Sequence, residues 1–295
     1  MDVAEQIDSG KLVCPRTGQR LFVSDDKEWL VSRNRDTEYK LFDKSIPIML
    51  TDPEWACQYA NESSKMTDEY RPEVVSSKPS MLQRIKSVLT QDYRSEASIN
   101  AFNSIFEELP ENALCLSIGG GPKRPHPLLV NVNIGPFVNV DVVADAHLLP
   151  YAEDSVDAIY CEAVIEHLYN PAQAISEMYR VLKPDGKAFV CTPFMQSYHG
   201  YPHHYQNYTL TGHKRLFEVA GFNIREAGTC VGPTYTLVNL VSCYLSEYSP
   251  GLIRTPVCKI WGLFGVIIRP LDKILNLRDN SYMLASTTYL LASKQ

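Results

Sequence analysis

Apolar residues in the second half of the chain fall in short continuous runs separated by segments with helical spacing. From Ala113 the runs are ALCLSI, LLVNVNI, VDVVADA, VDAIYC and KAFVCTPF. Strands that alternate with helices in this way predict a parallel sheet with helices on its faces. The clearest helix begins at Pro171, keeps its apolar residues on one face and ends at KPDG. Another is expected over 211–220, and FNIREAG after Gly221 is expected as a strand.

Different patterns flank this core. Residues 11–50 alternate short β-runs with charged turns, which predicts a small β-rich module over residues 1–50. Residues 51–95 are polar and mixed, so we predict a linker with a helical stretch after Ser80. The remaining predicted divisions are a core over 96–230, an apolar helical insertion or lid over 231–280, and the final strand of the core sheet over 281–295.

The composition is that of an ordinary globular protein, with 21% charged residues and a net charge of -6. An acidic chain without basic runs makes nucleic acid an unfavoured partner. The opening MDVAEQIDSGK has no basic stretch followed by an apolar one, so the cytoplasm is the expected location. Eight widely spaced cysteines without a C-x-x-C pair predict reduced thiols. The longest apolar run, Ile260–Ile268, is shorter than the roughly 20 residues of a spanning helix, so no membrane crossing is expected.

Glycines end the first run of the core, where missing side chains let a ligand approach the backbone: Gly119, Gly120 and Gly121. The loop has no G-x-G-x-x-G pattern, and three prolines between 122 and 127 break the helix that would hold a pyrophosphate. A dinucleotide is therefore excluded in favour of a cofactor with a small carboxylate and an ammonium. We expect Lys123 or Arg124 to neutralise that carboxylate.

Polar residues at the next strand ends suit an adenosyl group. Asn133 ends the second run, where its amide is placed to hydrogen-bond ribose hydroxyls. Asp145 ends the third run and is placed to accept from an exocyclic amine, while Ala146 flanks a flat adenine.

More than fifty residues carry a resemblance to a known family. The stretch VDVVADAHLLPYAEDSVDAIYCEAVIEHLYNPAQAISEMYRVLKPDGKAFVCTPF is similar to the D-A-x-x-L-P-F, S-F-D, EH and RVLKPGG succession of class I methyltransferases of the type 11 family. The resemblance implies a Rossmann-like seven-stranded sheet with an antiparallel last strand and S-adenosylmethionine as cofactor. It further implies contacts of Gly119 and Gly121 to the methionine part, Asn133 to the ribose, Asp145 and Ala146 to the adenine, and a place for Glu162 near the methyl donor.

The segment after the fifth strand, PFMQSYHGYPHHYQNYT, is dense in histidine and tyrosine and is expected to form the acceptor wall. It also resembles the PFxxxYHxxPxDYxRxT stretch of short-loop relatives. Its catalytic candidates are His199, His203 and Tyr208, with His199 the preferred base because imidazole titrates near neutral pH. An alternative is that these rings only order the loop. Glu166-His167 is expected to be a helix-start pair, and no carboxylate–histidine spacing supports a metal, so none is predicted.

The outer segments leave alternatives open. Cys14-Pro15 and the ending Tyr39 to Met49 resemble the zinc-ribbon-like module of some rRNA guanine methyltransferases, but Thr17 stands where the second cysteine belongs. A single thiolate cannot hold zinc, so we predict a metal-free remnant that packs by its apolar residues. The insertion is expected to cover the site or to form a homodimer interface. Contact with a membrane surface is the alternative, since Lys259, Arg269 and Lys273 flank its apolar run.

Together these features predict an enzyme that transfers a methyl group to an O, N or C atom of a small-molecule or sugar-bearing (glycan) acceptor. One alternative is an RNA methyltransferase, suggested by the N-terminal module. Another is a non-catalytic scaffold, because Ser117 replaces the acidic residue usual before the glycines and Asn133 replaces a carboxylate.

Overall fold

A seven-stranded sheet forms the centre of the computed structural model, which describes residues 1–42, 44–51, 92–121, 124–200 and 203–295. Its strand order is β10-β11-β9-β8-β5-β6-β7, and only β11 runs antiparallel to its neighbours. This confirms the predicted Rossmann-like sheet with an antiparallel last strand. The strands are β5 (Cys115–Ile118), β6 (Leu129–Asn133), β7 (Val142–Val143), β8 (Val156–Glu162), β9 (Leu182–Pro193), β10 (Asn223–Val231) and β11 (Thr287–Ser293).

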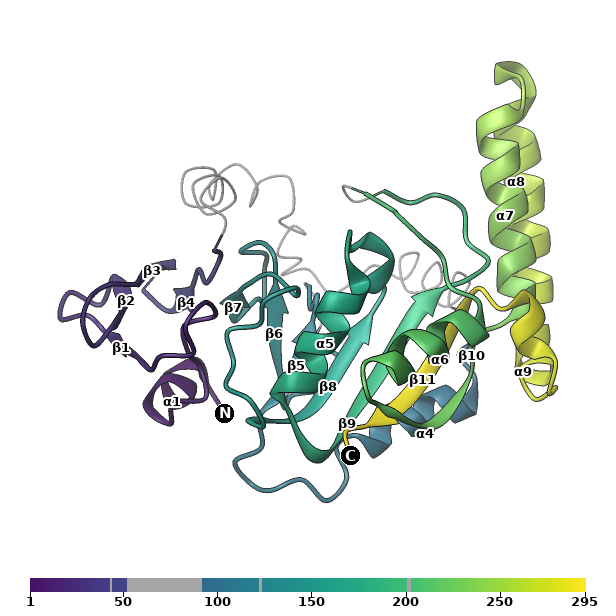
Figure 1. Ribbon diagram of the computed structural model, residues 1–295. Helices are drawn as coiled ribbons and strands as arrows, with labels where there is room; N and C mark the ends of the chain where they lie inside the picture. Colours follow the sequence, from purple (N-terminus) through teal and green to yellow (C-terminus); the bar gives the residue numbers. More distant parts are fainter. Residues whose placement is uncertain (43, 52–91, 122–123, 201–202) are drawn as a thin grey trace.

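Helices cover both faces of this sheet (Figure 1). On one face lie α5 (Pro171–Val181) and α6 (Leu210–Val219), close to the ranges predicted from the sequence. Asn170 and Thr209 cap them by accepting a hydrogen bond from the backbone N–H three residues later. On the other face α4 (Glu96–Ser104) packs Ala101 against the aromatic residues of β8, β9 and β11.

The N-terminal module is a small antiparallel sheet docked against the edge strand β7. It consists of α1 (Val3–Asp8), β1 (Leu21–Val23), β2 (Trp29–Ser32), β3 (Glu38–Phe42) and β4 (Ile46–Pro47), with the strands paired in chain order. Met49 N donates to the Val143 carbonyl at 2.7 Å, so the module covers an edge that would otherwise expose unpaired backbone groups. Cys14 is buried with its sulfur 3.2 Å from the Tyr39 hydroxyl. The zinc-ribbon resemblance remains a prediction.

The linker predicted over residues 51–95, with its helix after Ser80, lies almost wholly outside the described residues. The segment resumes at Asp92, and the Arg94 backbone forms a bridge with Val231 at the end of β10.

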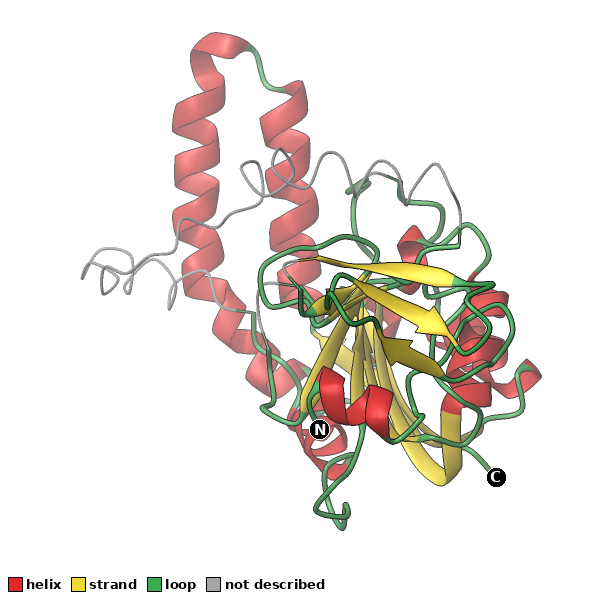
Figure 2. Cartoon of the chain, turned by 90° about the vertical axis from the view of Figure 1, so that its left-hand side faces the viewer, coloured by secondary structure: helices red, strands yellow, loops and turns green. Residues whose placement is uncertain are grey.

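The predicted insertion is a pair of long helices that stands away from the sheet (Figures 1 and 2). We call α7 (Pro233–Tyr248) and α8 (Gly251–Ile268) the helical hairpin. It continues through η2 (Arg269–Leu271), α9 (Asp272–Leu275) and η3 (Ser281–Leu284) to β11, which therefore starts at Thr287 rather than at residue 281.

One stretch of this insertion, Gly251–Leu275, is long and apolar enough to cross a membrane, and only 6% of its apolar window is buried. The sequence analysis did not single out this stretch, because it counted only the continuous run Ile260–Ile268, whereas a helix extends the apolar surface across the polar residues on either side.

Candidate functional site

The ends of the central parallel strands place the predicted residues next to one another. Ile118 at the end of β5 is paired with Val132 on β6 and Cys161 on β8. The residues that follow them are Gly119, Asn133 and Glu162, so these three end side by side at the carboxyl edge. This edge is where open α/β sheets bind ligands.

The three glycines of the loop meet different surroundings. Gly119 has φ +73°, and a Cβ there would lie 2.2 Å from Val164 Cγ2, so both its conformation and its packing require glycine. A Cβ on Gly120 would lie 2.6 Å from Asn131 Oδ1. At Gly121 a Cβ would meet none of the described residues within 4 Å. The first two glycines are thus needed by the protein's own packing, and the third borders open space.

Asparagines on β6 hold this loop in place. Asn133 Nδ2 donates to the Gly120 carbonyl at 2.9 Å, and its Oδ1 accepts from Ile134 N at 2.7 Å. Asn131, which the sequence analysis missed, donates through Nδ2 to the Asn139 carbonyl at 2.8 Å, and its buried Oδ1 has no hydrogen-bond partner among the described residues. The role of Asn133 at the ribose stays a prediction. What the structure adds is that its amide orders the glycine loop.

Asp145 follows β7 at the same edge, next to the half-buried Ala146. Its Oδ1 accepts from both the backbone N–H and the ring Nδ1 of His147, at 2.9 and 2.6 Å. Burial alone would raise the pKa of Asp145, but the hydrogen bonds from His147 hold it below its usual value. Its Oδ2 accepts no hydrogen bond from the described residues, so an ionised acceptor is available there.

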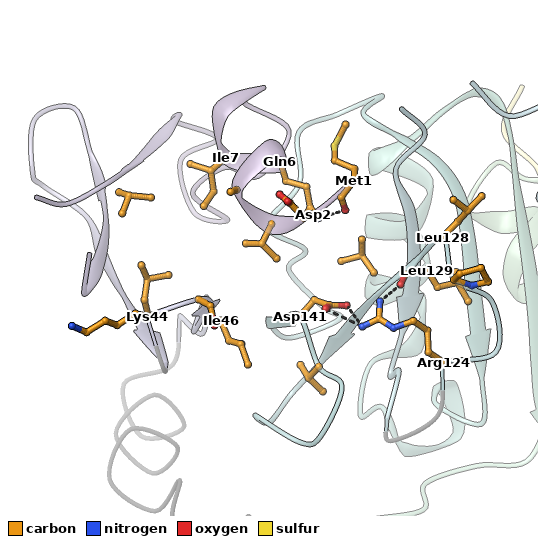
Figure 3. A pocket seen from close by; sticks show the side chains of 18 of the residues that line it. Met1, Asp2, Gln6, Ile7, Lys44, Ile46, Arg124, Leu128, Leu129 and Asp141 are labelled. Carbon is orange, nitrogen blue, oxygen red and sulfur yellow. Dashed lines mark hydrogen bonds and ion pairs between the residues drawn. The ribbon is translucent and has the colours of Figure 1, made fainter. Parts of the chain in front are cut away.

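Arg124 does not face the glycine loop. Its guanidinium pairs with Asp141 at 2.8 Å and donates to the Leu129 carbonyl. These residues lie at the amino-terminal ends of β6 and β7, beside an open cavity of about 750 Å³ between α1 and the core (Figure 3). Asp141 therefore already neutralises Arg124, and the role of Lys123 or Arg124 at a cofactor carboxylate stays a prediction. Lys123, the other candidate, lies outside the described residues.

Glu162 forms an ion pair with Arg94 that the sequence analysis did not predict. Its carboxylate accepts from the Arg94 guanidinium and from the Tyr160 hydroxyl. Burial opposes the charge of Arg94, yet the neighbouring Glu162 raises the Arg94 pKa above its usual value. Burial and Glu162 together also raise the pKa of Tyr160. Glu162 therefore reaches the predicted edge already paired with Arg94, at the end of the predicted linker.

Three side chains form what we call the Glu166 cluster: Glu166, His167 and His199. The first two lie in η1 (Ile165–His167), which follows the Val164 side chain that contacts Gly119. Glu166 Oε1 lies 3.7 Å from His167 Nε2 and 3.8 Å from His199 Nε2. The Glu166 side chain is fully buried, and neither of its oxygens makes a hydrogen bond of good geometry with a described residue, although the buried Thr192 hydroxyl is close enough to lower the Glu166 pKa. Burial raises its pKa to about 7.

Backbone carbonyls fix the orientation of both imidazoles. His167 Nδ1 donates to the His203 carbonyl at 2.5 Å, and His199 Nδ1 donates to the Ser197 carbonyl at 3.0 Å. A carbonyl only accepts, so each ring carries its proton on Nδ1 when neutral and presents the Nε2 lone pair to Glu166. The three donor atoms lie within 4.8 Å of one another, which makes the cluster a group that can hold a metal ion.

The other residues predicted to face the acceptor differ in how close their side chains lie to this cluster. The His204 ring centre is 4.2 Å from that of His199. Tyr208 is half-buried beside Glu166, and burial followed by that carboxylate raises its pKa to about 12. His203 is exposed and reaches the cluster only through its backbone carbonyl. Of the predicted catalytic side chains, the structure thus gathers His199 and Tyr208 but not the ring of His203.

Comparison with known proteins identifies the central part of the chain. The family described as Methyltransferase domain matches residues 128–190. A probable S-adenosylmethionine-dependent methyltransferase of Mycolicibacterium smegmatis is 34% identical over 84 residues, which cover 26% of this chain and 33% of that protein. A bifunctional biotin biosynthesis protein of Cellvibrio japonicus is 43% identical over 51 residues, or 17% of this chain and 10% of that protein. The chain thus spans a third or less of these curated relatives.

Among solved structures, an S-adenosylmethionine-dependent methyltransferase of Thermotoga maritima, described as a possible histamine N-methyltransferase, aligns with a TM-score of 0.42 at 16% identity. The alignment covers 82% of this chain and 99% of that one.

Proposed function

This chain carries a class I S-adenosylmethionine-dependent methyltransferase domain, and from that premise we propose that it transfers the methyl group to a small-molecule or sugar-bearing acceptor. One observation carries the proposal. The glycine loop, Asp145 and the Glu166 cluster come from four separate segments, yet they converge on a single edge of the sheet.

The residues at this edge fit the adenosyl cofactor. The open space beside Gly121 leaves the loop backbone accessible, and Asp145 Oδ2 offers an acceptor to the adenine amine. Asn133 and Ala146 are the neighbours proposed for the ribose and the flat face of the base. Glu162 supplies a carboxylate beside the glycine loop, although Arg94 shares it.

When bound, S-adenosylmethionine supplies an electrophilic methyl group on a sulfonium. The protein's residues then have to align the acceptor in line with that methyl group, exclude water and receive a proton from an acceptor hydroxyl. The contact between Gly119 and Val164 puts η1 directly against the cofactor loop. The Glu166 cluster and Tyr208 are therefore the groups proposed to face the acceptor and to take part in moving its proton.

A methyl-transfer assay separates this function from its alternatives. The purified protein is incubated with methyl-labelled S-adenosylmethionine and, separately, with a panel of sugars, nucleotide sugars and phenols or with RNA. The proposal is supported if the unmodified protein transfers the label to a small molecule and the Asp145→Ala variant does not. Label only in RNA, with strong salt dependence, replaces it with the RNA methyltransferase. Absence of both transfer and cofactor binding would leave the non-catalytic scaffold.

A further inference from the structure

We propose that Glu166, His167 and His199 bind a divalent transition-metal ion such as zinc. The spacing of their donor atoms fits a metal site better than a directly hydrogen-bonded acid–base group. Carboxylate–imidazole distances of 3.7 and 3.8 Å exceed the roughly 2.7–3.2 Å of an N–H···O hydrogen bond. Ligands at about 2.0–2.2 Å from a tetrahedral ion lie roughly 3.3–3.6 Å from one another. The three donor atoms now lie within 4.8 Å of one another, and an inward movement of the side chains brings them to that separation.

The hydrogen bonds around the cluster are those of metal-binding histidines. Such histidines generally donate their second ring N–H to a carboxylate or backbone carbonyl, which sets the tautomer and aims the lone pair. His167 does this with the His203 carbonyl and His199 with the Ser197 carbonyl. Both Nε2 lone pairs are thereby directed at the same carboxylate.

Glu166 provides a second, independent observation. A fully buried carboxylate without a hydrogen bond of good geometry among the described residues is costly to ionise, because a charged group in the interior requires a counter-charge or several donors to replace water. A divalent ion between the three donors supplies that charge. Two imidazole nitrogens and one carboxylate oxygen are a ligand set that zinc and neighbouring transition metals accept while keeping a position open.

The role of the ion rests on the proposed methyl transfer, whereas the site itself does not. An ion with an open position lowers the pKa of a hydroxyl bound there. The hydroxyl proton passes to water, and the oxygen then forms the new bond to carbon as the carbon–sulfur bond of the donor breaks. This makes His199 a ligand, in place of the free base expected from the sequence.

Calorimetric titration of the chelator-treated full chain with zinc tests the site. One bound ion per chain is expected, and Glu166→Gln and His199→Ala should each weaken its binding at least about tenfold. His203→Ala is the matched control, because its ring is exposed and should leave zinc affinity unchanged. Cobalt is a second probe, whose visible absorption should appear in the unmodified protein and fade in both ligand variants.

Two outcomes overturn the metal site. One is that the folded protein does not bind zinc, and the other is that Glu166→Gln and His199→Ala bind zinc as tightly as the unmodified protein. Circular dichroism shows whether each variant is folded, and the partly exposed His199 offers a ligand whose loss leaves the interior undisturbed. Titration with S-adenosylmethionine in parallel tests the proposed function separately, since cofactor binding without zinc binding rejects only the metal.

The helical hairpin carries an independent inference, because it exposes an apolar stripe along α8. Ile253, Ile260, Leu263 and Ile267 are spaced by seven, three and four residues, which puts them on one helix face. All are exposed, Leu263 at 67%, and α8 buries only Gly265. We infer that this stripe binds the surface of a membrane that contains anionic lipids.

Charge favours that partner over a second copy of this acidic chain. The insertion, residues 231–280, carries five basic residues (Arg254, Lys259, Arg269, Lys273 and Arg278) and three acidic ones (Glu247, Asp272 and Asp279), a net charge of +2. Asp272 is buried and accepts from the N–H groups of Thr234 and Tyr235 at the start of α7. The insertion is therefore locally basic in a protein of net charge -6. Apolar and basic residues on one amphipathic element are typical of helices that lie in a lipid interface.

Geometry indicates a helix that lies in the interface instead of crossing it. The helix α7 follows β10 and α9 leads on to β11, so both ends of the hairpin join the sheet on the same side of any membrane that the hairpin enters. An upright hairpin would also carry Arg254 and Lys259 into hydrocarbon, where charges are disfavoured. Lying flat, these side chains reach the headgroups. Since α7 starts two residues after β10 ends, the hairpin rises from the carboxyl edge that holds the candidate site.

Co-sedimentation with vesicles tests this surface. The full chain should sediment with phosphatidylcholine vesicles that contain phosphatidylglycerol, and less with phosphatidylcholine alone. A variant with Leu263→Glu and Ile267→Glu should lose most of this binding. Val219→Glu is the matched control, because Val219 is 68% exposed on α6, outside the hairpin.

Two results contradict membrane binding. One is an unmodified protein that stays in the supernatant with anionic vesicles. The other is vesicle binding that the double glutamate variant retains. A dimer in analytical ultracentrifugation that the same variant dissociates, without vesicle binding, assigns the stripe to a second copy instead.

Discussion

Two apolar segments of this chain, β9 and α8, have opposite surroundings. From Ala188 to Pro193 every residue of β9 is buried between α4 on one face of the sheet and α5 and α6 on the other. Along α8 the side chains of IWGLFGVII lie largely in solvent. Burial of apolar area is the main favourable term in folding, so β9 stabilises the fold whereas α8 retains most of its apolar surface for a partner.

The difference predicts where substitutions affect stability and where they affect binding. Between the two extremes lies the carboxyl edge of the sheet, whose side chains are half-buried and hydrogen-bonded to loops. Replacements in β9 should lower the free energy of unfolding, those at the edge should lower ligand affinity, and those on α8 should do neither in the absence of a membrane.

The largest expected effect is at the centre of the sheet. Phe189 on β9 is fully buried and stacks with Tyr289, with ring centres 5.8 Å apart. Phe189→Ala should reduce the free energy of unfolding by about 3–5 kcal/mol, because it removes buried apolar area and leaves a cavity. Urea denaturation followed by circular dichroism measures the change. A loss below about 1 kcal/mol would mean that β9 is not the stabilising segment we describe.

A buried histidine next to this sheet predicts a pH dependence. His213 on α6 is fully buried, and burial lowers its pKa from about 6.5 to about 3. Below pH 6.5 the unfolded chain takes up a proton there and the folded chain does not, so stability falls as the pH falls from about 6.5 towards 3. Between pH 7 and pH 5 we expect a loss of about 2 kcal/mol from this group.

His213→Gln isolates that contribution, because glutamine does not titrate and retains a polar contact to Thr288. Unfolding free energies of the two proteins are compared at pH 7 and pH 5. Parallel pH dependence in both would remove His213 from the explanation.

At the carboxyl edge, Asp145→Ala should affect binding more than stability. Losing the acceptor for the adenine amine should weaken S-adenosylmethionine binding by about 1–3 kcal/mol. Calorimetric titration measures the affinity, and Asp154→Ala provides a control because that carboxylate pairs with Lys294 away from this edge. Equal affinities of the Asp145 variant and the unmodified protein would exclude Asp145 from the cofactor site.

The smallest effect should be that of Leu263→Ala on the hairpin. Because Leu263 is 67% exposed, its truncation should change the free energy of unfolding by no more than about 0.5 kcal/mol in solution. The comparison is made by the same urea denaturation used for Phe189. A loss of several kcal/mol would show that α8 packs against another part of the protein, and the contrast with β9 would disappear.

Local patterns made the cofactor edge predictable from the sequence. Gly119, Asn133 and Asp145 each directly follow a hydrophobic run, and parallel strands necessarily bring such residues to one edge. The same local logic located α5 through Pro171 and its apolar face.

Contacts between distant segments were not predictable in this way. Arg94 reaches Glu162 from the end of the linker, and His199 meets Glu166 through a loop with no periodic pattern. Lys123 or Arg124 was expected at the cofactor carboxylate because both are next to the glycines, but the sequence did not reveal the ion pair between Arg124 and Asp141. The exposure of α8 was equally hidden, because an apolar helical pattern does not reveal whether its face meets the core or a partner.

A crystal structure with S-adenosylhomocysteine would locate the cofactor site. We expect the adenine beside Asp145 and the sulfur between the Gly119–Gly121 loop and the Glu166 cluster. A ligand bound in the cavity beside Arg124, or at any place away from the carboxyl edge, would contradict this expectation.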